Sequence, residues 1–404
     1  MISENGNSKI VRPYTKKDVS QLQNSIKIEH TMANQGSKKL HSQLKSEGYV
    51  SALGALTGNQ AIQQVEAGLR AIYVSGWQVA ADGNTSGTMY PDLGLYPSNS
   101  MPATIRAINN ALLRKDQIEP QKADWLVPVV ADGEAGFGGV LNTYELTKNM
   151  IEAGVAGIHL EDQLPSARKC GHLGGKVLIT PQEFIDKLVA ARLASDVLDV
   201  PTVIIARTDA YGAEFITYDV DPDDKKFLSG EQTYEGFYKV KGGIDLAIKR
   251  ALKYAPYADA LWFETPTPNL HDAKLFSENI HKKYPNKALF YNCSPSFNWT
   301  NTINVENFQD ELGKMGYKFQ FVTLAGFHSL NSSMFNLSKE YKERGMAAYS
   351  ELQHNEINLE DKGYSALKHQ SFVGTKYYDN LLRIIMQNKS STNSLDKSTE
   401  INQF

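Results

Sequence analysis

The sequence lacks most features that mark secreted, membrane or nucleic-acid-binding proteins. Two cysteines among 404 residues exclude a disulfide framework and leave no paired spacing for a structural zinc site. No stretch approaches the roughly 18 uninterrupted apolar residues of a membrane helix, and the polar start of the chain lacks a signal-peptide pattern. The formal net charge of −3 gives no basic excess for nucleic acid or an anionic membrane. We therefore expect a cytoplasmic protein without such partners, in which local charges bind any anionic ligand.

The pattern along the chain changes near residue 71. Helix-period patterns over 18–29 and 59–68 predict a helical leader within residues 16–70. From residue 71, short apolar runs alternate with helical patterns at 142–153, 181–195 and 243–254, which is typical of βα units. The apolar runs are 71–74, 127–131, 157–160, 202–206, 260–263, 288–291 and 319–322. Because these runs are continuously apolar, they predict parallel strands buried on both faces.

Each predicted strand is followed by a polar residue. These residues are Ser75, Asp132, Glu161 with Asp162, Arg207 with Asp209, Glu264, Asn292 with Ser294, and Thr323. TIM barrels carry their catalytic residues at the carboxyl ends of the strands, so this recurrence favours an α/β fold of the TIM-type (β/α)8 barrel class. A doubly wound sheet would bind ligand mainly beside one switch point. The pattern leaves the eighth strand unplaced.

These patterns predict three parts of the chain. We expect a helical segment over 1–70, a catalytic barrel over 71–340, and C-terminal helices with a tail over 341–404. A turn-rich β insertion interrupts the barrel at about 211–241, where Asp219, Asp221, Asp223 and Asp224 cluster. The cluster suits either calcium or a solvated turn, and the absence of EF-hand spacing favours the turn.

Cys170 lies in an unusually basic stretch, between Arg168 and Lys169 on one side and His172 and Lys176 on the other. Positive neighbours lower the pKa of a thiol from about 8.5, which predicts a group that exchanges protons near neutral pH. The alternative is an inert packing cysteine, which is our interpretation of Cys293.

A second candidate site follows the strand at 127–131. Asp132 and Glu134 stand at the start of a glycine-rich loop over 133–139. Carboxylates suit magnesium, with Asp92 and Glu161 as further direct or water-mediated ligands. The loop lacks the closing Lys-Ser or Lys-Thr of a P-loop, which argues against a phosphate cradle, and a plain surface loop is the remaining alternative.

Donors for an anionic ligand follow other strands. Arg207 offers a fork for a carboxylate, or it pairs internally with Asp209. The stretch 292–299 and Thr323 provide amide and hydroxyl groups that can hold a carboxylate gaining charge during a reaction, although each alone is an ordinary turn former. Gly76 permits close approach of a ligand, and Trp77 fits either a binding site or the core.

Together these motifs carry a family resemblance. In order they are 75–84, 90–97, 132–139, 159–163, 169–176, 207–210, 292–299 and 323–328. With them the chain resembles isocitrate lyase over about residues 10–404, at the length of the bacterial form. The resemblance implies a homotetramer whose neighbouring subunits exchange helices. It also implies dependence on Mg²⁺, with Mn²⁺ as a possible substitute, and cleavage of isocitrate into glyoxylate and succinate in the glyoxylate cycle.

The resemblance also assigns roles to residues. Asp132 would be the principal metal ligand, with Asp92, Glu134 and Glu161 around it mostly through water. The catalytic residues would be Cys170 as acid/base, His172, and Tyr73 as the first candidate for the base that takes the substrate hydroxyl proton, ahead of a metal-linked carboxylate. The substrate would be held by Ser75, Gly76, Trp77, Gly171, His172, Arg207, Asn292, Cys293, Ser294, Pro295, Ser296 and Thr323.

The chain departs from the family pattern at a few positions. Arg168 stands where lysine is common, and further departures are Gly83, Leu93, Gly94 and the inverted pair Thr180 and Pro181. None of these changes removes a proposed catalytic group.

Two alternative functions and one further resemblance complete the expectations. The alternatives are 2-methylisocitrate lyase, whose chains are commonly shorter, and a silent dicarboxylate-binding protein. Retention of Cys170, His172, Asp132 and Arg207 argues against the silent protein. The tail over 390–404 resembles the closing lid of the family.

Overall fold

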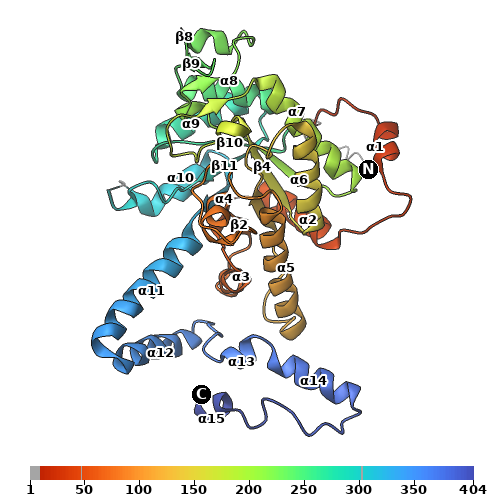
Figure 1. Ribbon diagram of the computed structural model, residues 1–404, viewed down its shortest axis with the longest axis vertical. Helices are drawn as coiled ribbons and strands as arrows, with labels where there is room; N and C mark the ends of the chain where they lie inside the picture. The colour runs from red at the N-terminus through yellow and green to blue at the C-terminus, as the bar shows by residue number, and fades with distance from the viewer. Residues whose placement is uncertain (1–9, 47, 302–303) are drawn as a thin grey trace.

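Eight parallel strands form a closed barrel at the centre of the protein (Figure 1). The computed structural model describes residues 10–46, 48–301 and 304–404. Around the barrel the strand order is β1-β12-β11-β10-β6-β4-β3-β2. The strands are β1 Val50–Gly54, β2 Ile72–Val74, β3 Val129–Asp132, β4 Gly157–Glu161, β6 Val203–Thr208, β10 Ala260–Phe263, β11 Ala288–Asn292 and β12 Tyr317–Val322. The predicted TIM-type barrel and its seven predicted strands are confirmed.

The barrel strands are apolar because both of their faces are covered. All residues of β3, β4, β6 and β10 are buried, as expected for parallel strands between a packed interior and a layer of helices. Aromatic rings fill much of the interior, where Tyr73 and Trp262 both pack against Phe321. The interior is therefore a core, and ligands can enter only at its rim.

The eighth strand is β1, so the expectation of an entirely helical segment before residue 71 is wrong at Val50–Gly54. Val50 pairs with Phe319 of β12, and Leu53 pairs with Ile72 of β2, so β1 closes the barrel between its last and second strands. The sequence of β1 is short and contains serine, alanine and glycine, which have low strand propensity. Its two strand neighbours, rather than its own residues, hold it extended. Residues 1–9 of the predicted segment lie outside the described residues.

Helices cover the outside of the barrel in the predicted alternation. They are α1 Lys16–Leu22, α2 Thr31–Lys45, α3 Gly58–Glu66, α4 Gly76–Gln78, α5 Ser100–Ile118, α6 Val140–Glu152, α7 Pro181–Val197, α8 Ile244–Tyr254, α9 Leu270–Lys283 and α10 Phe308–Lys314. The predicted helices at 59–68, 142–153, 181–195 and 243–254 are confirmed within a few residues. The predicted helix at 18–29 is wrong beyond Leu22, where the helix ends, and Ile26 and Ile28 are exposed.

The insertion forms a small separate sheet, as predicted. The hairpin of β8 Leu228–Gln232 and β9 Tyr238–Val240 joins β7 Phe215–Ile216 and β5 Val177–Leu178 in the order β5-β7-β9-β8. The interpretation of its acidic cluster as a solvated turn is wrong for Asp224, which is buried and ion-paired with Arg250. Asp221 pairs with Lys253. The carboxylates thus tie the insertion to α8.

The last five helices extend away from the barrel (Figure 1). They are α11 Ala325–Arg344, α12 Met346–Glu360, α13 His369–Phe372, α14 Thr375–Ile385 and α15 Thr399–Gln403, and we call residues 325–404 the C-terminal arm. The arm meets the barrel layer again at α5, where the Lys115 ammonium lies 4.7 Å from the centre of the Phe372 ring. None of the helices in the described ranges has the length and apolarity of a transmembrane span.

Candidate active site at the rim of the barrel

A single cavity gathers most of the predicted site residues at the carboxyl ends of the strands. It is lined by Tyr73, Ser75, Trp77, Asp92, Asp132, Arg168, Cys170, Gly171, His172, Arg207, Glu264, Ser294, Pro295, Ser296, Thr323 and Leu324. Cys170 and Asp132, which lie far apart in the sequence, therefore face the same space. Of the predicted site residues, Gly76, Glu134, Glu161, Asn292 and Cys293 do not line it.

The Asp132 carboxylate at the end of β3 is held by backbone N–H groups. The amide of Gly76 donates to Asp132 Oδ2 over 3.2 Å, and the amide of Glu134 donates to Asp132 Oδ1 over 2.8 Å. A Cβ atom on residue 76 would lie 2.3 Å from Glu134 Oε1 and 2.7 Å from Asp132 Oδ2. Gly76 thus allows two carboxylates to approach the backbone, which explains its place beside the site without contact to the cavity.

Arg168 lies among the predicted metal ligands. Its Nε atom is 2.6 Å from Glu134 Oε2 and 2.7 Å from Glu161 Oε1, and Nη1 forms an ion pair with Asp92. All four side chains are buried. In the part of the chain that the structure describes, no three His, Cys, Asp or Glu side chains stand ready to hold a metal ion. The guanidinium instead draws three of the four carboxylates to itself.

The carboxylate cluster nevertheless has the chemistry of a cation site. Burial raises the pKa of Glu134 well above its usual range and that of Glu161 to about 7. Glu161 Oε2 accepts no hydrogen bond from any described residue. Because a buried carboxylate ionises more readily beside a divalent cation, and because hard cations prefer oxygen ligands, the donor set fits Mg²⁺ or Mn²⁺.

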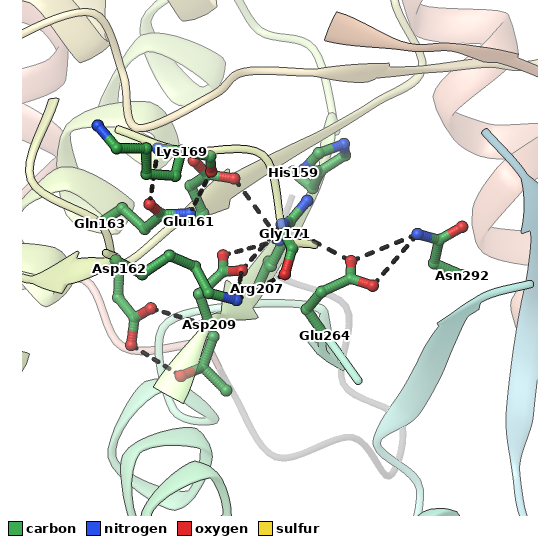
Figure 2. Close-up of polar contacts among 12 residues, drawn as sticks. His159, Glu161, Asp162, Gln163, Lys169, Gly171, Arg207, Asp209, Glu264 and Asn292 are labelled. Atoms are coloured by element: carbon green, nitrogen blue, oxygen red, sulfur yellow. Dashed lines mark hydrogen bonds and ion pairs between the residues drawn. The ribbon is translucent and has the colours of Figure 1, made fainter. Parts of the chain in front are cut away.

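Cys170 does not have the readily ionised thiol that its sequence neighbours predict. Burial, followed by the negative charge of Asp92, raises the pKa of Cys170 to about 12. Arg168 is engaged with carboxylates, and Figure 2 shows the Lys169 ammonium directed away from Glu161. The prediction of a low thiol pKa is therefore wrong, because burial outweighs the lowering effect of Arg168 and Arg207 on the pKa of Cys170. At neutral pH the thiol is protonated, as a proton donor must be.

The donors predicted for substrate carboxylates are engaged with acidic side chains. Arg207 donates from Nε and Nη2 to Asp209 over 2.9 and 3.0 Å, so its internal ion pair is the state that the structure shows. Glu264 lies 3.6 Å from Arg207 Nη2 and 3.2 Å from Asn292 Nδ2 (Figure 2). It also lies 3.3 Å from His172 Nε2. The donors in and beside the cavity that could bind an anion are thus already paired with carboxylates.

Gly171 sits directly against these groups. A Cβ atom at residue 171 would lie 2.6 Å from Arg207 Nη2 and 2.7 Å from Glu264 Cγ. A side chain at this position would therefore separate the Cys170 segment from the rim of the barrel.

The barrel interior supplies a tyrosine and a histidine below the cavity. The Tyr73 hydroxyl and His159 Nε2 share a hydrogen bond of 2.8 Å, and His159 Nε2 lies 3.6 Å from Asp132 Oδ1. Burial raises the pKa of Tyr73 well above its usual range and lowers that of His159 to about 4. Both groups are therefore neutral at pH 7, and they link the cavity to Asp132.

The remaining predicted residues have simple local roles. The Ser75 side chain caps α4, and the Trp77 ring packs edge-on against Phe327 at 4.7 Å while also lining the cavity. Ser294 Oγ accepts a hydrogen bond of 3.1 Å from the Ser296 amide, which shapes the turn after β11. Cys293 packs in the hydrophobic core, as interpreted from its sequence.

Sequence reasoning missed two residues of this arrangement. The sequence marks Glu264 only as a polar residue after a predicted strand, because its contacts with three donors depend on side chains from distant segments. His159 could have been noticed as the one ionisable residue inside the apolar run 157–160, whose alternation directs it inward.

Comparison with known proteins shows that nearly the whole chain matches one family. The sequence profile of the isocitrate lyase family matches residues 2–233 and 228–404. The isocitrate lyase of Halalkalibacterium halodurans is 58% identical over 402 residues, which cover 98% of this chain and 94% of that protein. Isocitrate lyase 1 of Mycobacterium tuberculosis is 56% identical over 403 residues, with the same coverage.

Solved structures share the fold at much lower identity. A 2,3-dimethylmalate lyase, described as a PEP mutase/isocitrate lyase superfamily member, has a TM-score of 0.61 at 21% identity and covers 90% of this chain and 98% of its own. The phosphoenolpyruvate phosphomutase of Streptomyces platensis has a TM-score of 0.61 at 20% identity and covers 87% of this chain and 99% of its own.

Proposed function

We propose which residues at the rim act on each half of isocitrate as it is cleaved into glyoxylate and succinate. The premise is that this chain belongs to the isocitrate lyase family and is an isocitrate lyase, a carbon–carbon lyase. The observation that carries the proposal is the shared cavity of Cys170 and Asp132. One side of the cavity offers a thiol for the succinate half of the substrate. The other side offers carboxylates for a metal ion at the glyoxylate half.

The family is metal dependent, and the ion proposed here is Mg²⁺, which Mn²⁺ can replace. Asp132 would bind it directly, with Asp92, Glu134 and Glu161 as direct or water-mediated ligands. The support is the buried set of carboxylates, with raised pKa values at Glu134 and Glu161. When bound, the ion would stabilise negative charge on the substrate hydroxyl oxygen and on the forming glyoxylate.

Tyr73 is the proposed base for the substrate hydroxyl. Its raised pKa argues against a free phenolate, so the proton must pass through the phenol. Tyr73 would take the hydroxyl proton while giving its own proton to His159 Nε2, 2.8 Å away. Ionised Asp132, 3.6 Å from the same nitrogen, would stabilise the imidazolium. His159 is therefore proposed as the temporary holder of the proton.

Cys170 is the proposed acid. As the carbon–carbon bond breaks, its electron pair flows into the adjacent carboxylate of the succinate half, and the thiol proton goes to the carbon left behind. The raised pKa of Cys170 supports a protonated thiol at the start of this step. The extra charge would be stabilised by donors from Arg207, His172, Asn292, Ser294, Ser296 and Thr323. Arg207, His172 and Asn292 would exchange Asp209 or Glu264 for substrate carboxylates.

We further propose a homotetramer with exchanged helices, working in the cytoplasm. The support for assembly is the C-terminal arm, where Gly326 is the one buried residue of α11, and Phe335, Ile384 and Ile385 are more than two-thirds exposed. The two free cysteines suit a reducing compartment.

An assay of the purified protein tests the proposed metal and substrate. Glyoxylate release from isocitrate should stop in EDTA and return with added Mg²⁺, while Asp132→Asn should not recover at the same concentration. 2-Methylisocitrate, monitored by pyruvate release, should be the poorer substrate. Full turnover in EDTA, or a preference for 2-methylisocitrate, would contradict the proposal.

A further inference from the structure

The turn between β12 and α11 carries two residues of the cavity. Thr323 and Leu324 both line the cavity, and α11 begins at the next residue, Ala325. Of its 20 residues, α11 buries only Gly326, and residues 328–336 are all exposed or half-buried. The barrel can therefore hold this helix only at its first turn. Contacts made there determine where Thr323 and Leu324 lie.

Gln78 supplies a cap for α11 from outside the helix. Its Oε1 atom accepts a hydrogen bond of 2.9 Å from the amide of Phe327, the third residue of α11. Leu324 stands at the N-cap and accepts no side-chain hydrogen bond, so Gln78 satisfies one of the amides that a helix start leaves without a partner. The glutamine belongs to α4 and is only 1% exposed, so water does not compete for this bond.

The residue before Gln78 contacts the same position of α11. The Trp77 ring, which lines the cavity, packs edge-on against the Phe327 ring with 4.7 Å between the ring centres. The Gln78 amide donates to Ser75 Oγ over 3.5 Å, so a second cavity residue fixes the backbone of Gln78. Two neighbouring residues of α4 thus hold Phe327, one through its ring and one through its backbone.

β1 and α3 also contact the turn. A Cβ atom on Gly54, the last residue of β1, would lie 1.9 Å from the Thr323 carbonyl oxygen and 3.2 Å from Gln78 Nε2. Gln60 of α3 donates from Nε2 to the Gly326 carbonyl over 3.1 Å. The turn is therefore packed directly on the end of β1, and side-chain amides from two other helices bind the first residues of α11.

We propose that Gln78 is a positioning residue for the cleavage of isocitrate, supported by Gln60, and that it acts by holding the Thr323 hydroxyl in the cavity. This inference rests on the role given to Thr323 in the proposed function. Without the cap, the first turn of α11 would shift, because its buried amide would lack a partner. Thr323 would then move away from the charge that develops on the succinate half, while the other donors still bind the substrate.

Steady-state kinetics of two single variants and their combination test this role. Gln78→Met removes the cap, and Thr323→Val removes the hydroxyl. At saturating Mg²⁺, each should lower kcat for glyoxylate release about tenfold and leave KM for isocitrate within about twofold, because an interaction of the transition state is lost. The double variant should match Thr323→Val, since a hydroxyl that is absent cannot be displaced. Losses that multiply to about a hundredfold would show that Gln78 acts independently of Thr323, and would overturn the proposal.

Gln320→Met is the matched control. Gln320 lies in β12, three residues before Thr323, and is buried like Gln78. Its Nε2 atom donates to the carbonyls of Gln309 and Tyr317, neither of which lines the cavity. The variant should lose thermal stability with its buried hydrogen bonds, but its kcat and KM should stay within about twofold of the unchanged protein. A tenfold loss of kcat would reduce the effect of Gln78→Met to general destabilisation and overturn the proposal.

The outcomes separate this inference from the proposed function. If Thr323→Val loses turnover and Gln78→Met does not, the positioning role is wrong and the proposed function stands. If Thr323→Val keeps full turnover, the role proposed for Thr323 is wrong and the inference fails with it. Should Gln78→Met fail to fold, Gln60→Met decides, because it removes the hydrogen bond to Gly326 and should lower kcat severalfold at unchanged KM. An unchanged kcat in that variant would overturn the proposal.

Discussion

The barrel and the C-terminal arm are both built from amphipathic elements, but they differ in how much of their apolar surface this chain covers. Every residue of β4 and β6 is buried. In contrast, α11 buries only Gly326 of its 20 residues, and α12 buries only Ala348 of its 15. The barrel therefore has a complete core within one chain, whereas the arm has helices without matching surfaces.

The difference separates the candidate active site from the helices of the arm. The cavity is lined by strand ends and nearby loops, together with the start of the chain after β12. The end of the chain packs instead on the arm, where Glu400 accepts hydrogen bonds from the Gln370 and Ser371 amides. A lid formed by this tail would thus have to act from the arm.

The largest effect expected from this comparison of the two regions comes from a variant that disrupts the arm and leaves the barrel intact. Phe335→Asp combined with Ile384→Asp places charges at two strongly exposed apolar positions of α11 and α14. If these positions pack on another subunit, light scattering should show that the tetramer is lost, because burying unpaired charges is costly. Turnover should fall about a hundredfold if closure depends on a neighbour.

The control for this variant is Tyr234→Asp, a fully exposed position in the hairpin of the insertion. It should change neither mass nor turnover. A tetramer that survives the double substitution with full activity would show that the arm is stable without a partner.

The second prediction compares the loss of a buried ion pair in the insertion with the loss of an exposed ion pair in the arm. Asp224→Asn removes one partner of a buried pair with Arg250 and should lower the free energy of unfolding by about 3 kcal/mol. Glu351→Gln breaks the exposed pair with Arg344 on the arm and should leave the urea midpoint unchanged. Equal midpoints for the two variants would contradict the view that the buried ion pair of the insertion contributes more to stability than the exposed pair of the arm.

The smallest effect concerns the end of the arm. Deleting residues 390–404 removes a segment that packs on α13 and α14 and touches no barrel strand. Turnover should fall about tenfold, equivalent to ~1.4 kcal/mol of activation free energy, while the melting temperature changes little. A melting temperature that falls together with turnover would show that the tail is structural and is not a lid.

The sequence alone predicts the barrel well because its signals are local. Runs such as 260–263 and 288–291 are apolar throughout, and the polar residue after each run identifies the rim. The exception, β1, has no such signal because its partners β2 and β12 determine its conformation. The insertion shows the same limit, since burial of Asp224 depends on Arg250, 26 residues away.

The site is less predictable than the fold, because pairing depends on side-chain directions. Adjacent cations suggest an acidic thiol at Cys170, yet Arg168 turns toward the carboxylates and burial determines the pKa. The neighbourhood of Glu264 likewise brings together Arg207, His172 and Asn292 from three segments. The sequence motifs contain these residues, but they do not determine which side chains contact one another.

The two cysteines permit the most direct test of the central claim, that the thiol at the rim supplies a proton within the cavity of Asp132. Burial raises the pKa of both Cys170 and Cys293 to about 12, but only Cys170 lines the cavity. The measurement is glyoxylate release from isocitrate by Cys170→Ser and Cys293→Ser at saturating Mg²⁺. We predict that Cys170→Ser loses turnover by about 10³-fold or more with an unchanged circular dichroism spectrum, whereas Cys293→Ser stays within a few-fold of the unchanged protein. Turnover in Cys170→Ser within a few-fold of the unchanged protein would contradict the account.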